Sequence, residues 1–365
     1  MNTRSHRRTA VRILCPARRS IPLATSVTPS DRPTLICLTP VKNEAWILER
    51  FLRCASEWAD HIVIADQQSD DASRAIAAGF PKVVLIDNNS PAYDEGSRQR
   101  LLIDAARKLP SSGRRIFIAL DADEMLSANW CDSSEWHSIL TAPPGTVVRF
   151  EWVNLLPGFE TCWIPADDVP FGFVDDGASH RGDAIHSTRV PTRPSSPVLR
   201  LRDIRVLHYQ YVAWQRMSSK QRWYQCWERV NHPGKRATAI FRQYHGMHAR
   251  PTEEIHPFQP AWVENYERAG VDMRTVEAED GTWWDRDIIR LMSEYGPDYF
   301  RKQNVWDVDW VRVAKSAGLN GESQRFTDPR THFERSIHRW LSATQSRASS
   351  STVRWTQRAL RLCGW

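Results

Sequence analysis

The sequence lacks long apolar runs, and none reaches the roughly 18 to 20 residues that a helix needs to cross a bilayer. It also lacks a Cys-x-x-Cys pair, because its seven cysteines are scattered, and one of them, Cys37, falls in a predicted buried strand. The scattered cysteines favour reduced thiols in a cytosol. We therefore expect a cytoplasmic protein that is either free in solution or peripheral at a membrane.

A large charge excess and the zinc-protease motif are missing as well. The 49 Lys and Arg only modestly outnumber the 43 Asp and Glu, which fits a partner carrying phosphates or an anionic membrane surface. This excess is too small to indicate nucleic acid, and no DNA or RNA recognition motif is present. The pairs His245/His248 and Glu253/His256 do not form His-Glu-x-x-His, so we interpret them as loop residues.

The most informative stretch that is present joins an apolar run to a cluster of acids. Residues 115–120 are mostly apolar, and Asp121, Asp123 and Glu124 follow directly. The pattern predicts a buried strand that carries carboxylates at its C-terminal end, with Asp121 and Asp123 on one face because strand side chains alternate. Two such oxygen donors suit Mg²⁺ or Mn²⁺. The alternative is a solvated acidic turn after the strand.

Three further strand-like segments precede this stretch and alternate with helical patterns. At 365 residues the chain can bury a large core, which fits one sizeable α/β domain with additions. The alternation predicts a mainly parallel sheet, whose ligands collect beyond the carboxyl ends of the strands. Glu44, Asp66 and Asp121 lie at such ends, although each could instead cap a helix. The predicted strands are 35–41, 61–66, 82–87 and 115–120, and the predicted helices are 45–58, a segment ending at 78, and 97–109.

The segments 39–44, 64–71 and 120–124 resemble the nucleotide-sugar-binding half of family 2 glycosyltransferases, which have the GT-A fold. The resemblance covers about residues 34–130 and implies an inverting transfer of a sugar from a nucleoside diphosphate. Gln67 and Gln68 depart from the family pattern, which commonly has Asp or Asn with Gly. Carried over by position, the resemblance implies the following roles: Pro40 and Glu44 at the edge of the nucleoside site, Asp66 as acceptor from the base, Arg98 facing the nucleotide or its phosphates, and Asp121 and Asp123 holding the ribose and the metal.

The second half offers candidates for the remaining chemistry. Residues 145–154 predict a strand, and residues 165–197 have the composition of a long functional loop. Asp175 and Asp176 are the candidate catalytic bases, because they follow an apolar run that could bury one of them and raise its pKa. The alternative is an exposed Asp-Asp-Gly turn. His208 resembles the position at which the family often adds a metal or diphosphate contact.

Composition divides the chain into four segments. Residues 1–33 carry seven Arg and one acid, which predicts a disordered basic arm. We expect a GT-A-like domain over 34–230, with a nucleotide-sugar half at 34–130 and an acceptor half at 131–230. An accessory helical region follows at 231–330, and a basic tail at 331–365 is either a contact with an anionic membrane or a frayed end.

The predicted fold is therefore α/β, a GT-A-like mostly parallel sheet flanked by helices with a C-terminal helical extension. The predicted function is metal-assisted transfer of a sugar from a nucleoside-diphosphate sugar to a glycan or lipid-linked acceptor. Two alternatives stay open. One is a metal-dependent nucleotidyltransferase, although the segment 40–44 lacks the Gly-rich loop usual after its first strand. The other is a non-catalytic nucleotide- or glycan-binding protein, because no base is evident.

Overall fold

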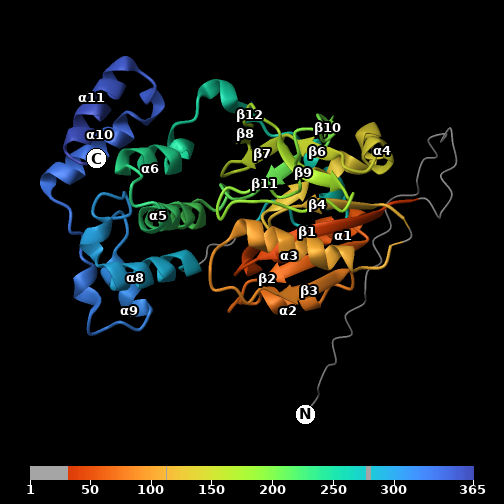
Figure 1. Ribbon diagram of the computed structural model, residues 1–365, viewed down its shortest axis with the longest axis horizontal. Coiled ribbons are helices and arrows are strands. Elements are labelled where there is room, and N and C mark those ends of the chain that lie inside the picture. Colours follow the sequence, from red (N-terminus) through yellow and green to blue (C-terminus); the bar gives the residue numbers. More distant parts are fainter. Residues whose placement is uncertain (1–31, 112, 277–280) are drawn as a thin grey trace, which may run out of the picture. The chain divides into compact units, whose positions relative to one another are not determined.

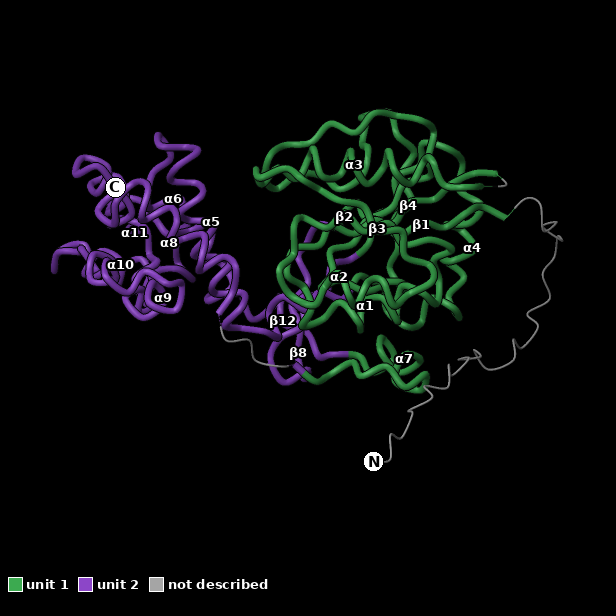
Figure 2. Tube along the Cα trace, turned by 90° about the horizontal axis from the view of Figure 1, so that it is seen from below, with its two compact units in different colours: residues 1–150, 168–206, 259–275 green, residues 151–167, 207–258, 276–365 purple. Residues whose placement is uncertain are grey.

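The computed structural model describes residues 32–111, 113–276 and 281–365, and the predicted basic arm at 1–33 therefore lies almost wholly outside the described residues. The chain forms two compact units and passes between them five times (Figure 2). The predicted boundaries at 130, 230 and 330 do not coincide with these units. Unit 1 consists of the described part of Met1–Phe150 with Asp168–Val206 and Gln259–Thr275, and unit 2 consists of Glu151–Asp167, Leu207–Phe258 and Val276–Trp365.

Unit 1 is built on a seven-stranded mixed sheet (Figure 1). In their order across the sheet the strands are β10 (Val198–Arg200), β6 (Val147–Phe150), β9 (Val169–Val174), β4 (Arg115–Ala119), β1 (Thr34–Val41), β2 (His61–Asp66) and β3 (Val83–Asp87). The four strands from β4 to β3 are parallel, as predicted. Val41 pairs with Asp66, and Asp66 with Asp87, so the carboxyl ends of β1, β2 and β3 lie along one edge.

Helices cover both faces of this parallel half, with α3 on one side and α1 and α2 on the other (Figure 2). The helices and short elements of unit 1 are α1 (Ala45–Trp58), α2 (Ser73–Ala78), α3 (Glu95–Arg107), β5 (Glu124–Leu126), η1 (Ala128–Cys131), α4 (Ser134–Thr141), η4 (Pro260–Trp262) and α7 (Glu264–Arg268). Leu102 and Ile103 of α3 pack on Leu38 and Val63, which point to the same face of neighbouring strands. The α/β fold class with helices on the sheet is therefore confirmed.

The structure differs from the sequence prediction in two segments of the sheet. Residues 145–154 form β6 in unit 1 and β7 in unit 2, separated at Glu151, instead of one strand. The predicted loop at 165–197 contains β9, which is antiparallel to both β4 and β6. Gly172 allows this pairing, because a β-carbon there would lie 2.8 Å from the β-carbon of Val148.

Unit 2 combines a small group of strands with the helices of the C-terminal half. The strands β12 and β8 pair, as do β8 and β7, both antiparallel. Helix α5 packs on α6 and α8, and α6 packs on α10. The elements are β7 (Trp152–Leu155), β8 (Thr161–Trp163), β11 (Val206–His208, whose first residue belongs to unit 1), α5 (Trp214–Asn231), α6 (Ala237–Tyr244), η2 (Gly246–Ala249), η3 (Thr252–Glu254), β12 (Ile255–Pro257), α8 (Trp283–Tyr295), η5 (Pro297–Phe300), α9 (Trp310–Ser316), η6 (Ser323–Phe326), α10 (His332–Ala343), η7 (Gln345–Arg347) and α11 (Ser351–Leu362).

The predicted basic tail folds as the helices α10 and α11. Thr331 and Glu334 form a capping box at the start of α10, and the Ser350 side chain accepts a hydrogen bond at the start of α11. Ile337 of α10 and Trp365 at the end of the chain pack in one buried cluster with α6. The alternative prediction of a frayed end is therefore wrong for this segment. Over the residues that the structure describes, no helix combines the length and the apolar character needed to cross a membrane.

Candidate functional site

The loops that follow β1 and β2 are tied together at the carboxyl edge of the sheet. The Asn43 amide donates to the Asp70 carboxylate at 2.5 Å, and the Asp70 backbone N–H donates to Asn43 Oδ1 at 2.9 Å. The backbone N–H groups of Asn43 and Glu44 donate to the hydroxyls of Ser69 and Ser73 at 2.9 and 2.8 Å. Asn43 has a φ of 55°, a conformation that Asn tolerates better than most residues. The two loops therefore form a preformed, cross-linked rim.

Asp66 ends β2 and is only 1% exposed. Its Oδ2 accepts from Arg74 Nη1 at 2.7 Å and from the Ser69 backbone N–H at 3.2 Å. Arg74 also pairs with the exposed Asp87 at 2.9 Å, and hydrogen bonds to both carboxylates raise the pKa of Arg74. The second Asp66 oxygen, Oδ1, is buried without a hydrogen-bond partner among the described residues. Because such an orphan acceptor costs about 1 to 3 kcal/mol, Oδ1 is a position where a ligand N–H would be stabilised.

The two glutamines that depart from the family pattern take part in the same rim. The Gln67 side-chain amide donates to the carbonyls of Ser90 and Ala92 at 3.2 and 3.1 Å, which ties the loop after β2 to the loop after β3. Gln68 has a φ of 55°, the left-handed backbone region that favours glycine. Gln67 therefore bridges two loops of the rim, whereas Gln68 adopts a backbone conformation that glycine would adopt at lower cost.

The remaining implied nucleotide contacts come from the same unit. Pro40 is buried in β1 and pairs with Ala65, one residue before Asp66. The Glu44 carboxylate accepts from the Trp46 indole N–H at 2.7 Å. Arg98 lies in α3, and its guanidinium sits 5.2 Å from the centre of the Tyr93 ring. Their roles toward a nucleotide stay predictions.

The predicted strand geometry of the acid cluster is wrong. β4 ends at Ala119, and Asp121 and Asp123 lie in a turn that the Glu124 backbone N–H closes on the Asp121 carbonyl at 2.9 Å. The alternation argument for a shared face therefore does not apply to these two carboxylates. The Glu124 side chain reaches back and accepts from the Asp121 backbone N–H at 2.8 Å. The turn thus points Asp121 and Glu124 toward a common partner.

That partner is Arg189, a residue that the sequence did not single out. Its Nη2 donates to Asp121 Oδ2 at 2.9 Å and to Glu124 Oε1 at 3.0 Å, and its Nη1 donates to Glu124 Oε2. The guanidinium also lies 4.8 Å from the centre of the Phe171 ring. Burial opposes the charge of Arg189, but the carboxylates of Asp121 and Glu124 outweigh it and raise the pKa of Arg189. The acid cluster therefore already contains a cation supplied by the chain.

The segment that carries Arg189 is docked on the start of α3. The backbone N–H groups of Glu95 and Gly96 donate to the carbonyls of Ala184 and Asp183 at 2.9 and 3.0 Å. A β-carbon on Gly96 would lie 2.4 Å from the carbonyl oxygen of Gly182, so this close approach requires glycine. The Glu95 carboxylate also accepts from the Ser187 backbone N–H at 2.9 Å. These contacts fix the position of Arg189 two residues further on.

Asp175 and Asp176, the predicted bases, lie at the other edge of the sheet. Because β9 is antiparallel to β4, its C-terminal end is beside the first residue of β4, and the Asp175 N–H donates to the Arg115 carbonyl at 2.9 Å. That edge is roughly 20 Å along the strand from Asp121, at about 3.3 Å per residue. Asp175 accepts from Arg107 at 2.8 Å, and Asp176 pairs with Arg193. This geometry does not favour the predicted base role.

His208 belongs to unit 2, whereas Asp121 and Asp123 belong to unit 1. Its Nδ1 lies 2.8 Å from Asn154 Oδ1, and its ring stacks on Trp152 with centroids 4.5 Å apart. Within the described ranges, no three His, Cys, Asp or Glu side chains are grouped in a way that could hold a metal ion. As the carboxylates stand, they do not fit the predicted divalent cation, because Asp121 and Glu124 already share a guanidinium.

Neither a family model nor a curated protein matches the chain. Among solved structures, it is similar to glucosyl-3-phosphoglycerate synthase from Mycobacterium tuberculosis in complex with Mn²⁺, UDP and glucosyl-3-phosphoglycerate, at 18% identity over 34% of this chain and 45% of that chain, with a TM-score of 0.24. It is also similar to 4-diphosphocytidyl-2C-methyl-D-erythritol synthase (14% identity, 47% and 90% covered, TM-score 0.28). HddC from Yersinia pseudotuberculosis gives 10% identity, 48% and 93% covered, and a TM-score of 0.28. The matched part spans less than half of the first synthase, and likenesses of this size carry no inference about activity.

Proposed function

We propose that unit 1 binds a nucleoside-diphosphate sugar at the carboxyl edge of its sheet and that the chain is an inverting glycosyltransferase acting on a glycan or lipid-linked acceptor. The observation that supports this most directly is the orphan Oδ1 of Asp66, a buried acceptor at a strand end. Nucleobases present ring or exocyclic N–H donors that satisfy such an oxygen. Ligands of open α/β sheets gather at this edge.

The other residues in the proposal come from elements of the same unit. Pro40 lies on β1, the strand beside β2, and Arg98 on α3 supplies a cation for the diphosphate. In the proposed reaction an acceptor hydroxyl attacks the anomeric carbon, the bond to the diphosphate oxygen breaks, and the nucleoside diphosphate leaves. The hydroxyl proton passes to a base on the opposite face of the sugar. Asp175 and Asp176 are remote from this edge, so the proposal does not assign the base to them.

Replacing Asp66 by Asn is expected to abolish nucleotide binding, because the substitution removes the charged acceptor of the base. The measurement is the thermal shift of the purified full chain with a panel of nucleoside diphosphates and their sugars. A ligand at 100 times its Kd should stabilise the wild type by about 2.7 kcal/mol. Asp87→Asn is the matched control, since Asp87 also pairs with Arg74 but its side chain is 61% exposed, so its carboxylate is open to solvent.

The same panel, extended with nucleoside triphosphates, separates the proposed function from the two alternatives. A shift with nucleoside-diphosphate sugars, followed by release of the nucleoside diphosphate, supports a transferase. A shift that only nucleoside triphosphates produce indicates a nucleotidyltransferase, and donor binding without any turnover indicates a binding protein. If no nucleotide shifts the wild type, or if Asp66→Asn binds as the wild type does, the proposed site is incorrect.

We further propose that the C-terminal helices contact an anionic membrane surface, as one reading of the basic tail predicted. Residues 330–365 contain seven Arg and a single acid, Glu334, which pairs with Arg301. On α11 the apolar side chains of Trp355 and Leu362 are 68% and 91% exposed. Helical segments with basic and exposed apolar side chains bind the interface of anionic bilayers. A lipid-linked acceptor would be met on such a surface.

Binding to vesicles tests this contact. The wild type is expected to sediment with phosphatidylglycerol vesicles and not with phosphatidylcholine vesicles. Replacing Trp355 and Leu362 together by Ser should weaken the binding about tenfold or more, since it removes the exposed apolar area. Tyr295→Ser, at a side chain that is 42% exposed on α8, is the control and should bind as the wild type does. Equal binding to both kinds of vesicle would contradict the proposal.

A further inference from the structure

The Arg189 guanidinium at the acid cluster of unit 1 is held in a fixed position by the fold. Both terminal nitrogens of Arg189 donate hydrogen bonds to the Glu124 carboxylate, and Nη2 also donates to Asp121. Glu124 is fully buried, and the Arg189 side chain is 17% exposed. A forked contact of this kind matches the planar geometry of a guanidinium and a carboxylate. Arg189 is therefore an internal partner of the acids and not a mobile surface charge.

The packing around Arg189 keeps its guanidinium from moving away from Asp121 and Glu124. The approach of Gly182 to Gly96, and the Glu95 contact with the Ser187 N–H, hold the preceding residues on α3. The guanidinium also packs over Phe171, a fully buried side chain of β9. To free the carboxylates, the side chain would have to leave this packing and leave Glu124 buried without its counter-ion, which is unfavourable.

The presence of Arg189 lowers the affinity of these carboxylates for a divalent cation. If it enters beside Arg189, it is repelled by a positive charge only a few ångströms away in a poorly solvated place. If it replaces Arg189, it must first break the ion pairs with Asp121 and Glu124. Both routes weaken metal binding compared with the same acids without the arginine.

We propose that the guanidinium of Arg189 takes the place of a divalent cation at Asp121 and Glu124, so that the chain binds its nucleotide without a metal at these carboxylates. This inference departs from the metal expected for the family. It rests on the proposed function for the identity of the nucleotide, but the occupancy of the acids by Arg189 is independent of that function. Removing the guanidinium should therefore create a metal site that the wild type lacks.

The experiment titrates Mn²⁺ into the full chain without nucleotide and follows free Mn²⁺ by electron paramagnetic resonance. Arg189→Met is expected to bind Mn²⁺ at least about tenfold more tightly than the wild type, because the repelling charge is gone. Arg193→Met is the matched control: Arg193 lies four residues further along and pairs with Asp176 at the other edge of the sheet. It should bind Mn²⁺ as weakly as the wild type.

Two further measurements keep the test decisive. If Arg189→Met unfolds without metal, recovery of the fold in Mn²⁺ supports the inference, and no recovery overturns it. In the wild type, the nucleotide thermal shift should be the same in EDTA and in Mn²⁺. A shift that requires Mn²⁺, or equal Mn²⁺ affinity of wild type and Arg189→Met, would overturn the inference. Absence of any nucleotide shift would refute the proposed function alone, because the Mn²⁺ titration uses no nucleotide.

Discussion

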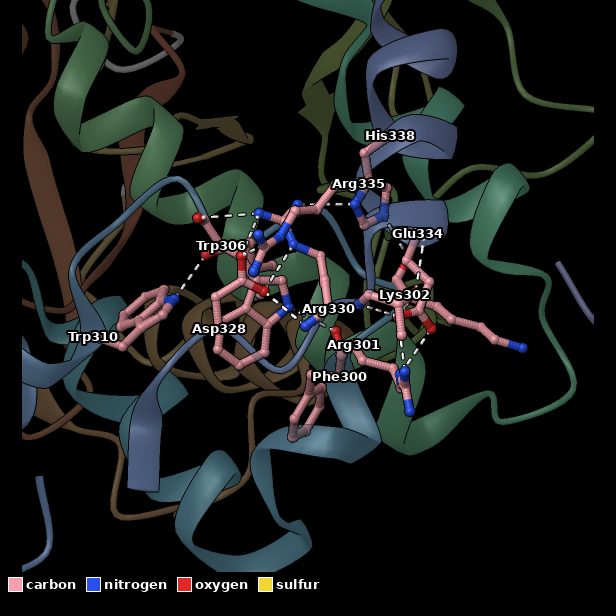
Figure 3. Close-up of polar contacts among 12 residues, drawn as sticks. Phe300, Arg301, Lys302, Trp306, Trp310, Asp328, Arg330, Glu334, Arg335 and His338 are labelled. Atoms are coloured by element: carbon pink, nitrogen blue, oxygen red, sulfur yellow. Dashed lines mark hydrogen bonds and ion pairs between the residues drawn. The ribbon is translucent and has the colours of Figure 1, made fainter. Parts of the chain in front are cut away.

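Replacing Arg330 by Met is expected to lower the free energy of unfolding by about 1.5 to 3 kcal/mol, because it removes several part-buried hydrogen bonds from a charged group. Arg330 is 12% exposed and joins several parts of unit 2 (Figure 3). It donates to both carboxylate oxygens of Asp328 at 3.0 Å, to His338 Nδ1 at 2.9 Å and to the Trp306 carbonyl at 3.3 Å. Its removal takes this donor from His338 Nδ1 and from the Trp306 carbonyl, and leaves Asp328 with the more exposed Arg335 as its charged partner.

Arg335→Met is the control for this prediction. Arg335 also pairs with Asp328, at 3.3 Å, but its side chain is 43% exposed (Figure 3). The same loss of charge should therefore cost less than about 1 kcal/mol. Urea unfolding of the two variants and the wild type gives the comparison. Equal losses in the two variants would mean that net charge, and not the part-buried hydrogen bonds of Arg330, sets the stability.

The parallel half of the sheet was predictable because its signals are local. The buried strands are runs of apolar residues, and α1 begins and ends at the predicted residues 45 and 58, since its apolar side chains recur at helical spacing. α3 begins at Glu95, two residues before the predicted start, because Asp94 caps it by accepting from the Ser97 N–H at 2.8 Å. Boundaries set by a single cap are harder to foresee than the elements themselves.

The candidate site was predictable only where it follows the strand ends. Asp66 lies where the pattern placed it, at the end of β2. The partner of Asp121 is Arg189, which lies 68 residues further along in a segment without periodicity. No local sequence pattern predicts such a contact. The position of Asp175 depends on the direction of β9, and an apolar run does not reveal whether a strand is parallel or antiparallel to its neighbour.

A loss of stability between pH 6.5 and pH 4 is expected from two imidazoles of unit 2, the buried His338 and the part-buried His245. His338 accepts from Arg330 at Nδ1, so its Nε2 carries the hydrogen that is donated to the Lys302 carbonyl at 3.1 Å, which is the neutral tautomer. His245 lies against the Phe241 ring, with centroids 3.8 Å apart. Burial is the main cause that lowers the pKa of each imidazole from 6.5 to about 4. Both side chains are therefore neutral in the folded chain at pH 7.

The sign of the effect follows from these lowered values. Above pH 6.5 the folded and unfolded chains hold the same protons at these two side chains, and their full contribution to stability is present. As the pH falls toward 4, only the unfolded chain binds protons there, so the free energy of unfolding decreases. Each imidazole contributes up to about 3 kcal/mol by this linkage. Other groups near His338, namely Asp328 and Glu334, have lowered pKa values and lose their contribution at more acidic pH.

His338→Gln separates this titration from general acid sensitivity. A glutamine can accept from Arg330 with its oxygen and donate to the Lys302 carbonyl with its nitrogen, yet it does not titrate. Urea unfolding at a series of pH values should therefore show that about one fewer proton is taken up on unfolding between pH 6.5 and 4. His332→Gln, at an exposed position of the same helix α10, is the matched control for the loss of a histidine. If His338→Gln keeps the full pH dependence of the wild type, the imidazole must take up its proton over the same pH range in the folded and the unfolded chain. The hydrogen bond from Arg330 to Nδ1 would then have to be absent in solution.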